Sequence, residues 1–325
     1  MFDRYRRNID YIRISVTDRC NLRCRYCMPE CGVEQVSHDQ ILRFDEMLRL
    51  VNVFACLGIK KIKLTGGEPL VRKGLPGMIA EIKKVKGIEQ VTMTTNGILL
   101  EENLPVLVAA GLDGVNISLD TLSAEKYHEI TRKEGIEKVL SSLDACSRYP
   151  ELRVKINAVT LADYNQDEIE NLALIARDRD IDVRFIEMMP MGLGKDFRGY
   201  DQNVIIEKLT AAFGQPVINE EKRGNGPAIY YKFDGFTGNV GFISAMSHTF
   251  CSDCNRVRLT SEGFLKPCLN FSEGVDLRRI MREGAGDEEL KNIIEETIFN
   301  KPGQHCFGKE SDREKDSRRM SAIGG

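Results

Sequence analysis

Short apolar runs and longer stretches of helical periodicity alternate along the first 186 residues of the chain. The runs rich in β-branched residues predict strands at residues 11–16, 61–65, 91–94, 114–119, 153–159 and 182–186. Amphipathic helices are predicted between them, most clearly at residues 44–57, 77–86, 136–147 and 167–178, and a glycine suited to a C-cap follows the first two. Strand–helix units in this order predict parallel strands joined by right-handed crossovers. The fold class is therefore α/β, either an open doubly wound sheet or an incomplete (β/α) barrel.

The pattern changes after Pro190. A glycine-containing loop at 191–200 precedes a predicted helix at 203–213, and residues 228–233 and 239–243 predict the two strands of a hairpin. A further helix is predicted at 290–299, and residues 308–319 are charged and expected to be flexible. We therefore divide the chain into residues 1–190 and a C-terminal lobe of residues 191–325.

Three cysteines stand close together directly after the first predicted strand. Cys20, Cys24 and Cys27 form C-x3-C-x2-C, and thiolates at such spacing suit zinc or an iron–sulfur cluster. Three thiolates on a four-iron cube leave one iron open for chemistry. Cys31 could act as a fourth ligand, but ferredoxin runs begin C-x2-C and place proline after the last cysteine, whereas Gly32 follows here. We interpret Cys31 as a bystander.

A second cysteine group lies in the C-terminal lobe. Its members are Cys251, Cys254 and Cys268, and His248 upstream would allow a four-ligand zinc site. Arg256 and Arg258 alternate on one face of a predicted strand just beyond Cys254. Paired guanidinium groups recognise phosphates, which a structural zinc site does not need, so this group favours a metal centre beside a phosphorylated ligand.

Cationic residues also occur within the otherwise apolar predicted strands. They are Arg13, Lys63, Lys155 and Arg184. A charged residue inside a barrel-type strand must face a polar site, because its burial elsewhere costs too much. The four together predict a cationic interior matched to a polyanion such as a nucleoside triphosphate.

Two glycines and a carboxylate follow the second predicted strand. Gly66 and Gly67 would let the backbone approach a ligand closely, and Glu68 places a carboxylate beside it. At the same strand edge as the first cysteines, this segment is a candidate grip for an amino-acid-like ligand.

Composition narrows the function classes. The 325 residues are 42% hydrophobic and 29% charged, with a net charge of −3, which is typical of a globular protein without a strong pull toward nucleic acid. No apolar run is long enough to span a membrane, and the first residues lack the pattern of a signal peptide. We therefore expect a cytoplasmic protein with reduced thiols, no nucleic-acid partner and no membrane partner.

The motifs taken together resemble those of the radical S-adenosylmethionine superfamily. The resemblance covers Cys20–Cys27 with the aromatic Tyr26 before the last cysteine, and the later strand-end segments Gly66-Gly67-Glu68-Pro69, Thr94-Thr95-Asn96-Gly97 and Ile117-Ser118-Leu119-Asp120. More narrowly, the chain is similar to the GTP 3′,8-cyclase family of molybdenum cofactor biosynthesis. That likeness rests on Ser15-Val16-Thr17-Asp18-Arg19-Cys20-Asn21, on Arg184-Phe185-Ile186-Glu187, on residues 250–259 and on the terminal Gly324-Gly325.

The resemblance implies an incomplete (β/α)6 TIM-type barrel whose open side is covered by the C-terminal lobe. Cys20, Cys24 and Cys27 would hold one [4Fe–4S] cluster with S-adenosylmethionine, and Cys251, Cys254 and Cys268 an auxiliary [4Fe–4S] cluster. Positions implied around S-adenosylmethionine are Tyr26, Gly67, Ser118 and Met189. Positions implied around GTP are Arg13, Lys63, Thr94, Lys155, Arg256 and Arg258, and Lys63 stands where relatives commonly have arginine. Arg184, Gly324 and Gly325 are implied catalytic residues, although the two glycines alone would be interpreted as a frayed tail.

The implied reaction converts GTP to (8S)-3′,8-cyclo-7,8-dihydroguanosine 5′-triphosphate, the first step of molybdopterin formation. A radical derived from S-adenosylmethionine removes hydrogen from C3′ of the ribose, and C3′ then bonds to C8 of guanine. Implied partners are an electron donor such as flavodoxin or ferredoxin and a cyclic pyranopterin monophosphate synthase that takes the product, and a homodimer is left open. The alternatives are a peptide-modifying radical enzyme with an auxiliary cluster, an electron carrier with two closed clusters, and a zinc-stapled nucleotide-binding module.

Overall fold

A single curved sheet organises the chain in the computed structural model, which describes residues 1–325 except 34–35, 222, 309–312 and 325. The strand order in this sheet is β12-β11-β10-β1-β2-β3-β4-β5-β6-β9-β8-β7. Its central strands are β1 (Tyr11–Ser15), β2 (Lys61–Thr65), β3 (Gln90–Thr95), β4 (Gly114–Ser118), β5 (Arg153–Val159) and β6 (Asp182–Ile186). Neighbours among these six are parallel and follow chain order, which confirms the predicted strands and the α/β class.

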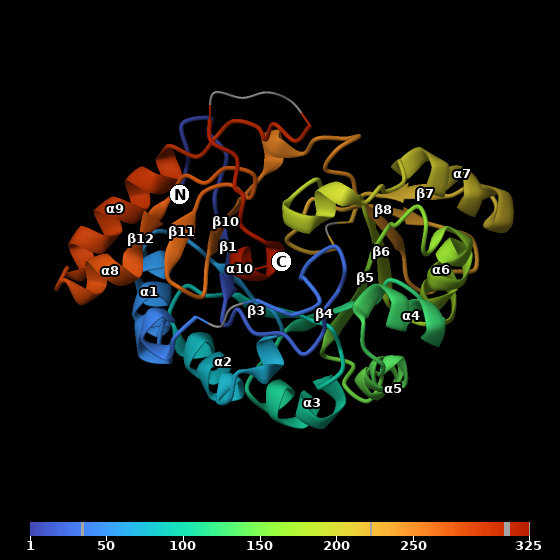
Figure 1. Ribbon diagram of the computed structural model, residues 1–325, viewed down its shortest axis with the longest axis horizontal. Coiled ribbons are helices and arrows are strands. Elements are labelled where there is room, and N and C mark those ends of the chain that lie inside the picture. Colours follow the sequence, from blue (N-terminus) through green and yellow to red (C-terminus); the bar gives the residue numbers. More distant parts are fainter. Residues whose placement is uncertain (34–35, 222, 309–312, 325) are drawn as a thin grey trace.

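Helices connect the central strands along the outer side of the arc (Figure 1). They are α1 (Phe44–Cys56), α2 (Leu75–Lys84), α3 (Leu100–Ala109), α4 (Ala124–Thr131), α5 (Ile136–Cys146) and α6 (Ile169–Asp178). The four helices predicted here are confirmed, with ends shifted by one or two residues. Short 3-10 turns are η1 (His38–Gln40), η2 (Pro69–Val71), η3 (Gln166–Glu168), η4 (Gly192–Asp196) and η5 (Cys251–Asp253). The open arc fits an incomplete barrel.

The C-terminal residues extend the sheet at both of its edges. On one side β9 (Val240–Ile243) is parallel to β6 and pairs antiparallel with β8 (Ile229–Lys232), the predicted hairpin, and β7 (Val217–Asn219) follows. On the other side β10 (Arg256–Leu259) is parallel to β1, followed by β11 (Phe264–Lys266) and β12 (Val275–Asp276). The remaining helices are α7 (Gln202–Phe213), α8 (Leu277–Arg282), α9 (Asp287–Phe299) and α10 (Met320–Ile323). The sheet is thus continuous across residue 190, and a domain boundary there stays a prediction.

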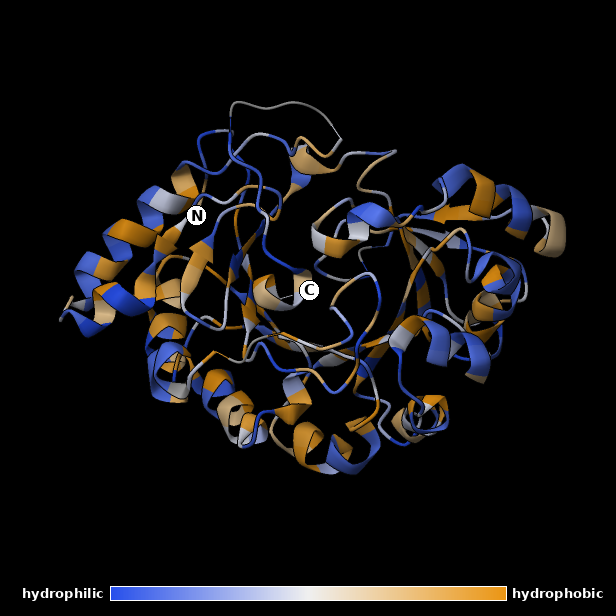
Figure 2. Ribbon diagram, viewed as in Figure 1, coloured by the Kyte–Doolittle hydropathy of each residue, from blue (hydrophilic) through white to orange (hydrophobic). Residues whose placement is uncertain are grey.

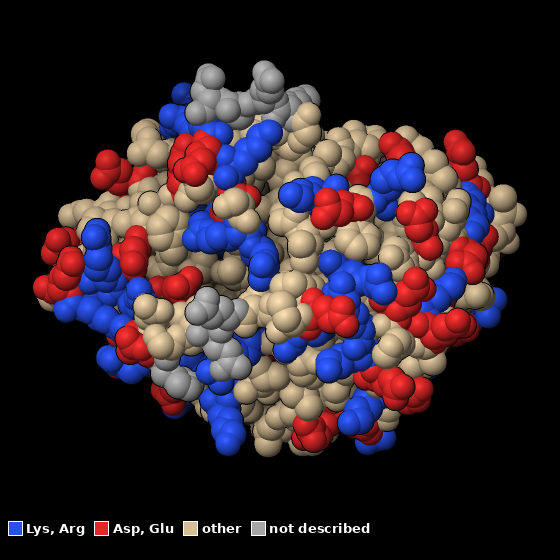
Figure 3. Space-filling model, viewed as in Figure 1, with Lys and Arg blue, Asp and Glu red and all other residues tan. Residues whose placement is uncertain are grey.

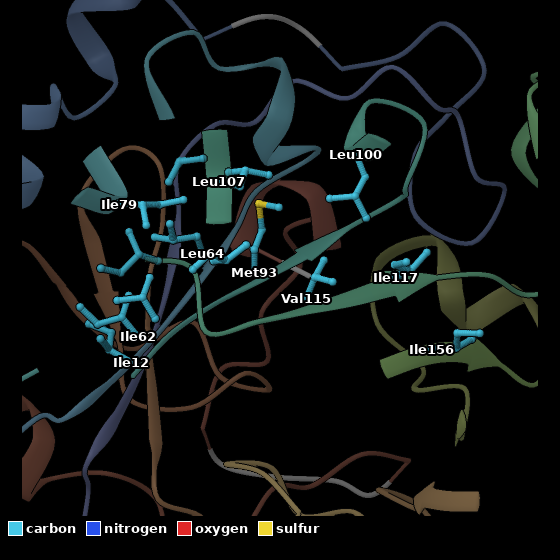
Figure 4. Packing of buried hydrophobic residues seen from close by; sticks show 14 of the residues in the cluster. Ile12, Ile62, Leu64, Ile79, Met93, Leu100, Leu107, Val115, Ile117 and Ile156 are labelled. Atoms are coloured by element: carbon cyan, nitrogen blue, oxygen red, sulfur yellow. The ribbon is translucent and has the colours of Figure 1, made fainter. Parts of the chain in front are cut away.

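The two faces of the sheet differ in polarity because side chains alternate along each strand. Ile62, Leu64 and Met93 point outward and pack with Ile79 of α2 and Leu107 of α3 in one large apolar core (Figure 4). The helices accordingly turn apolar sides toward the sheet and polar sides away from it (Figure 2). The intervening strand residues line the concave side, so this side carries the polar strand positions that the sequence singled out.

No helix among the described residues is long and apolar enough to cross a membrane.

Replacement of Phe54 by alanine tests the outer core. The Phe54 side chain is fully buried on α1, so Phe54→Ala should lower the free energy of unfolding by about 3–5 kcal/mol. Phe299, which is 51% exposed on α9, is the matched control, and Phe299→Ala should cost much less. Urea denaturation followed by circular dichroism measures both values. Equal losses for the two variants would contradict this assignment of the core.

Candidate functional site

The first three cysteines lie in the loop after β1, at the carboxyl edge of the central strands, where sites of parallel α/β folds form. The loop is tied to itself, since the N–H groups of Cys27 and Met28 both donate to the carbonyl of Cys24 at 2.9 Å. It is also tied to the end of α4, because Nη1 of Arg132 donates to the carbonyls of Arg23 (3.0 Å) and Met28 (3.2 Å). The loop conformation is therefore set largely by hydrogen bonds to its own backbone carbonyls.

The three thiols share a buried environment. Burial raises the pKa of Cys20 to about 11, that of Cys27 to about 12 and that of Cys24 well above its ordinary value. Cys20 and Cys27 raise the pKa of Cys24 further, and Cys20 also raises that of Cys27. A bound metal reverses this preference, because a coordinating thiol is deprotonated. The donor set therefore fits a metal–sulfur centre. Among the described residues no three His, Cys, Asp or Glu side chains are grouped to hold one ion, whereas a four-iron cube binds each thiolate on a separate iron.

The two glycines after β2 dock against the cysteine loop. The N–H of Gly67 donates to the carbonyl of Thr17 at 2.8 Å, and the N–H of Glu68 donates to the carbonyl of Arg19 at 2.7 Å. A Cβ atom at Gly67 would stand 2.3 Å from that Arg19 oxygen, and one at Gly66 would stand 2.6 Å from the Thr17 oxygen. Glycine is thus required here by close contact between two backbone segments.

Glu68 does not present an open carboxylate, and this part of the sequence interpretation is wrong. Its side chain accepts from the N–H of Leu70 (3.0 Å), the hydroxyl of Thr95 (2.7 Å) and the N–H of Asn96 (2.7 Å). Burial raises the pKa of Glu68 to about 7. The carboxyl group therefore joins the ends of β2 and β3, and the side chain of Asn96 reaches on to Asn21 in the cysteine loop at 2.7 Å.

Asp120, at the end of β4, fixes the aromatic residue of the cysteine motif. The Tyr26 hydroxyl donates to Oδ2 of Asp120 at 2.6 Å, while Oδ1 accepts from the N–H of Val159 at 2.8 Å. Burial raises the pKa of Asp120 to about 6. Asp120 and Asn96 belong to the strand-end segments of the family resemblance, but neither is assigned a role from the sequence, because one sequence does not show which strand-end polar residue meets which loop.

The other residues expected near S-adenosylmethionine lie at the same strand edge. Ser118 is the last residue of β4, half-buried, and its register partner is Asn157 on β5. Met189 follows β6 and packs beside a small apolar cluster of Met191, Phe307 and Ile323. Cys31 is exposed, with its sulfur 3.6 Å from the carbonyl oxygen of Gly32.

The concave side of the sheet carries a group of cations in adjacent register. Arg13 on β1 stands opposite Lys63 on β2 and opposite Arg258 on β10. Burial holds the pKa of Lys63 well below its ordinary value, and the neighbouring Arg184, Arg13, Lys155 and Arg256 add to this effect. Burial also lowers the pKa of Arg258, with help from Arg13 and Arg256. The predicted cationic interior is therefore confirmed as a close cluster of charges.

Several of these cations lack a counter-ion. Among the described residues no carboxylate pairs with Lys63, Arg184 or Arg256, and the buried Nε atoms of Arg184 and Arg256 have no hydrogen-bond partner. On the face drawn in Figure 3, lysine and arginine side chains lie around the centre with carboxylates among them. Buried charge without an internal partner calls for an anionic ligand.

Two predicted substrate residues already have partners in the chain. The ammonium group of Lys155 donates to Asp182 (2.7 Å), to the Tyr230 hydroxyl (2.9 Å) and to the carbonyl of Arg223. Asp182 is the first residue of β6, so this group lies toward the opposite end of the strands from the cysteine loop. The Thr94 hydroxyl accepts from Asn116 at 3.3 Å. A substrate contact by either residue stays a prediction.

The second cysteine group lies at the β10 edge of the sheet. Cys251 begins η5 and Cys254 directly follows it, Cys268 follows β11, and the N–H of His305 donates to the Cys251 sulfur at 3.4 Å. Burial alone would raise the pKa of Cys254, but Lys301 and Arg256 outweigh it and hold that pKa at about 7. Cys254 is thus prepared as a thiolate, which fits a metal centre. His248 is exposed, and its Nδ1 lies 3.2 Å from the Ser247 hydroxyl.

Among the described residues the C-terminal segment does not fray but enters the concave side, which agrees with the place that the family resemblance implies for Gly324. Helix α10 lies inside the arc in Figure 1, and the Ser321 N–H hydrogen-bonds the Cys27 sulfur. The carbonyl of Gly324 accepts from Nη1 of Arg258 at 2.7 Å. The tail therefore connects the first cysteine group to the cationic strands. Gly325 lies outside the described residues.

A methyl group at position 324 should release this tail. Gly324 has a φ of +82°, and an added Cβ would stand 2.9 Å from Ser15 Cβ and from Thr65 Oγ1. Gly324→Ala should therefore raise the rate of tryptic cleavage after Arg318 and Arg319 roughly tenfold or more. Gly77→Ala is the control, because a Cβ there meets nothing within 4 Å. An unchanged cleavage rate in Gly324→Ala would contradict the docked position.

Comparisons with known proteins agree with this geometry. A model of the Radical SAM superfamily matches residues 14–176, and a model described as Molybdenum Cofactor Synthesis C matches residues 181–307. The chain is 48% identical to a GTP 3′,8-cyclase of Clostridium perfringens (strain 13 / Type A) and 46% identical to one of Heliobacterium modesticaldum. Both alignments cover 100% of this chain and 100% of the relative.

Solved structures support the fold. The crystal structure of Streptococcus suis SuiB bound to S-adenosylmethionine matches with a TM-score of 0.63 at 16% identity, covering 84% of this chain and 65% of that chain. The chain thus spans about two thirds of SuiB, and the likeness concerns the fold alone. The matched family models and the full-length relatives show that the chain belongs to the GTP 3′,8-cyclase family of the radical S-adenosylmethionine superfamily.

Proposed function

We propose that this chain converts GTP to (8S)-3′,8-cyclo-7,8-dihydroguanosine 5′-triphosphate, the first step of molybdenum cofactor biosynthesis. The observation that carries the proposal is the cation cluster, in which the buried Lys63 and Arg184 and the half-buried Arg256 have no carboxylate partner among the described residues. A triphosphate supplies the missing negative charge. The full-length relatives named GTP 3′,8-cyclase identify the nucleotide.

Membership of the radical superfamily implies a [4Fe–4S] cluster and S-adenosylmethionine, and we assign them to Cys20, Cys24 and Cys27. When bound, this pair supplies one-electron cleavage of S-adenosylmethionine and so starts the radical chemistry. Tyr26, Gly67, Ser118 and Met189 would surround the S-adenosylmethionine. The Glu68 and Asp120 contacts hold the loop and the strand ends in fixed relation, which is what precise placement of a reactive group needs.

We assign an auxiliary [4Fe–4S] cluster to Cys251, Cys254 and Cys268. The support is the donor set of three thiols and the cations that favour ionisation of Cys254. Arg258 links this group to the substrate region, because its charge interacts with Cys268 while its guanidinium binds the Gly324 carbonyl.

The substrate must keep its own ribose C3′ and guanine C8 within bonding reach, so the chain has to hold both ends of GTP. The guanidinium groups of Arg13, Arg256 and Arg258 suit bidentate phosphate contacts, and Lys63 adds a point charge. Thr94 and Lys155 complete the proposed GTP residues. Arg184 donates to Asn157 at 2.5 Å from the next strand, which orients it for a catalytic role. The tail glycines would act by setting the position of Arg258.

The remaining proposals concern organisation and partners. We assign the radical chemistry to residues 1–190 and the auxiliary cluster and tail to residues 191–325. An electron donor such as flavodoxin or ferredoxin and a cyclic pyranopterin monophosphate synthase are the proposed partners, in the cytoplasm, and a homodimer is compatible with them. A peptide-modifying activity is not favoured, since SuiB shares only the fold whereas cyclases match over their full length.

Anaerobic incubation with GTP, S-adenosylmethionine and dithionite tests the reaction. We expect a product isomeric with GTP, identified by mass and by chromatography against GTP, together with methionine and 5′-deoxyadenosine. Cys24→Ala should abolish formation of the GTP isomer, methionine and 5′-deoxyadenosine, and should lower the iron content from about eight to about four per chain. Cleavage of S-adenosylmethionine without consumption of GTP would overturn the substrate assignment, and zinc without iron would overturn the cofactor assignment.

Substitution of Lys63 tests the cation cluster. Lys63→Met removes one buried charge and should raise the KM for GTP roughly tenfold or more, as loss of a charged hydrogen bond does. The pKa of Lys63 lies well below the ordinary value in the free chain, so GTP binding should take up a proton. The affinity of the wild type should therefore fall with rising pH.

Lys63→Arg separates the two effects, because arginine keeps its charge across this pH range. Its affinity for GTP should depend less on pH than that of the wild type. Lys60→Met is the neutral control, since Lys60 is exposed and pairs with Glu89. Equal KM values in Lys63→Met and Lys60→Met would show that GTP does not bind at the cluster.

A further inference from the structure

The first residues of the chain contain a buried ion pair beside the second cysteine group. The side chains of Asp3 and Arg7 are 0% and 4% exposed, and Nη2 of Arg7 lies 2.6 Å from Oδ2 of Asp3. Asp3 also accepts from the N–H groups of Tyr5 (2.9 Å) and Arg7 (3.0 Å). The pair is therefore fixed within its own turn, and the charge of Arg7 is neutralised locally.

Arg7 uses its remaining donors on two distant segments. Nη1 donates to the carbonyl of Cys251 at 2.7 Å and to that of Gly303 at 2.9 Å, and Nη2 donates to the carbonyl of Pro302 at 2.6 Å. One guanidinium thus joins a cysteine of the second group to the turn at residues 301–303. A surface ion pair would not need to be buried in this way.

Lys301 makes the corresponding contacts to the other two cysteine segments. Its ammonium donates to the carbonyl of Arg256 at 3.0 Å and to the carbonyl of Pro267. Pro267 directly precedes Cys268, and Arg256 stands two residues after Cys254. The residue is only 2% exposed, and no carboxylate pairs with it in the part of the chain that the structure describes.

Asp3, Arg7 and Lys301 together form what we call the basic brace. Its two cations, Arg7 and Lys301, donate hydrogen bonds to backbone carbonyls in all three cysteine-bearing segments, and these hydrogen bonds do not involve the cysteine sulfurs. Arg7 is neutralised by Asp3, whereas the charge of Lys301 is not compensated within the described residues. The two cations are therefore equipped for different tasks.

We propose that the basic brace positions the three thiolates of the second site, and that Lys301 provides the positive charge that stabilises its anionic iron–sulfur centre. This inference rests on the proposed auxiliary cluster. Reduction adds negative charge to such a centre, and nearby charge is one of the factors that set its potential. Lys301 therefore favours the reduced form, and Arg7 acts through geometry as a positioning residue.

The test measures iron content and midpoint potential in the full-length chain. Potentials are read by redox titration monitored by electron paramagnetic resonance, in a background with Cys20, Cys24 and Cys27 replaced by alanine, so that the second centre alone contributes. Lys301→Met should shift this potential to a more negative value, and Lys301→Arg should restore it. Lys291→Met, on the outer helix α9 where Lys291 pairs with Glu288, has the same change in net charge and should leave the potential unchanged.

Arg7→Gln should instead lower the iron bound at the second site by half or more, because the guanidinium fork is lost. Arg7→Lys keeps the positive charge but loses the forked guanidinium. Its second site should therefore still bind less iron than that of the wild type, whereas a role of charge alone would predict the wild-type iron content. Thermal unfolding of each apo-protein by circular dichroism identifies any variant that has not folded. If an Arg7 variant has not folded, the midpoint potentials of Lys301→Met and Lys301→Arg test the proposal.

The outcomes distinguish failure of the auxiliary cluster from failure of the role of the basic brace. If the alanine background binds no iron, the auxiliary cluster itself is wrong and the inference fails with it. If it binds about four irons but Lys301→Met and Lys291→Met have equal potentials, the auxiliary cluster stands and the role of Lys301 is overturned. Unchanged iron content in Arg7→Gln would overturn the role of Arg7.

Discussion

The site depends on the burial of positive charges on the concave side of one parallel sheet. Lys63 and Arg184 are buried there, and the half-buried Arg256 lies beside them, on strands whose opposite faces pack in the main core. Each such charge costs free energy in the empty chain. The helices and the outer core therefore stabilise a site that is unfavourable by itself, and an anionic ligand offsets part of the cost.

Much of this arrangement could be predicted from the sequence, since it depends on local pattern. The six central strands, the hairpin at β8 and β9 and the cation-bearing positions all follow from periodicity and from charges inside apolar runs. The cysteine groups were recognisable from spacing alone. The domain boundary and the residue roles at the site remain predictions.

Other features depend on contacts between distant segments and left no local signal. Glu68 looked like a free carboxylate because nothing shows from the sequence that Thr95 and Asn96 would use its oxygens. From the sequence, Lys155 is another cation within an apolar strand, like Lys63 and Arg184. In the structure its ammonium group donates hydrogen bonds to Asp182 and to the Tyr230 hydroxyl. The place of the tail follows from the family resemblance and not from its local pattern, because its contacts with Arg258, Ser15 and Thr65 come from distant strands.

The pairing of β1 with both β2 and β10 has a consequence for biosynthesis. The first cysteine loop and β2 emerge from the ribosome early. Their later partners emerge some two hundred residues or more afterwards: β10, the residues 251 and 303 that Arg7 contacts, and the C-terminal segment that reaches Ser15. Closing such long loops is slow compared with local pairing. A nascent chain therefore presents its first cysteine loop well before the second cysteine group and the C-terminal segment that packs against that loop.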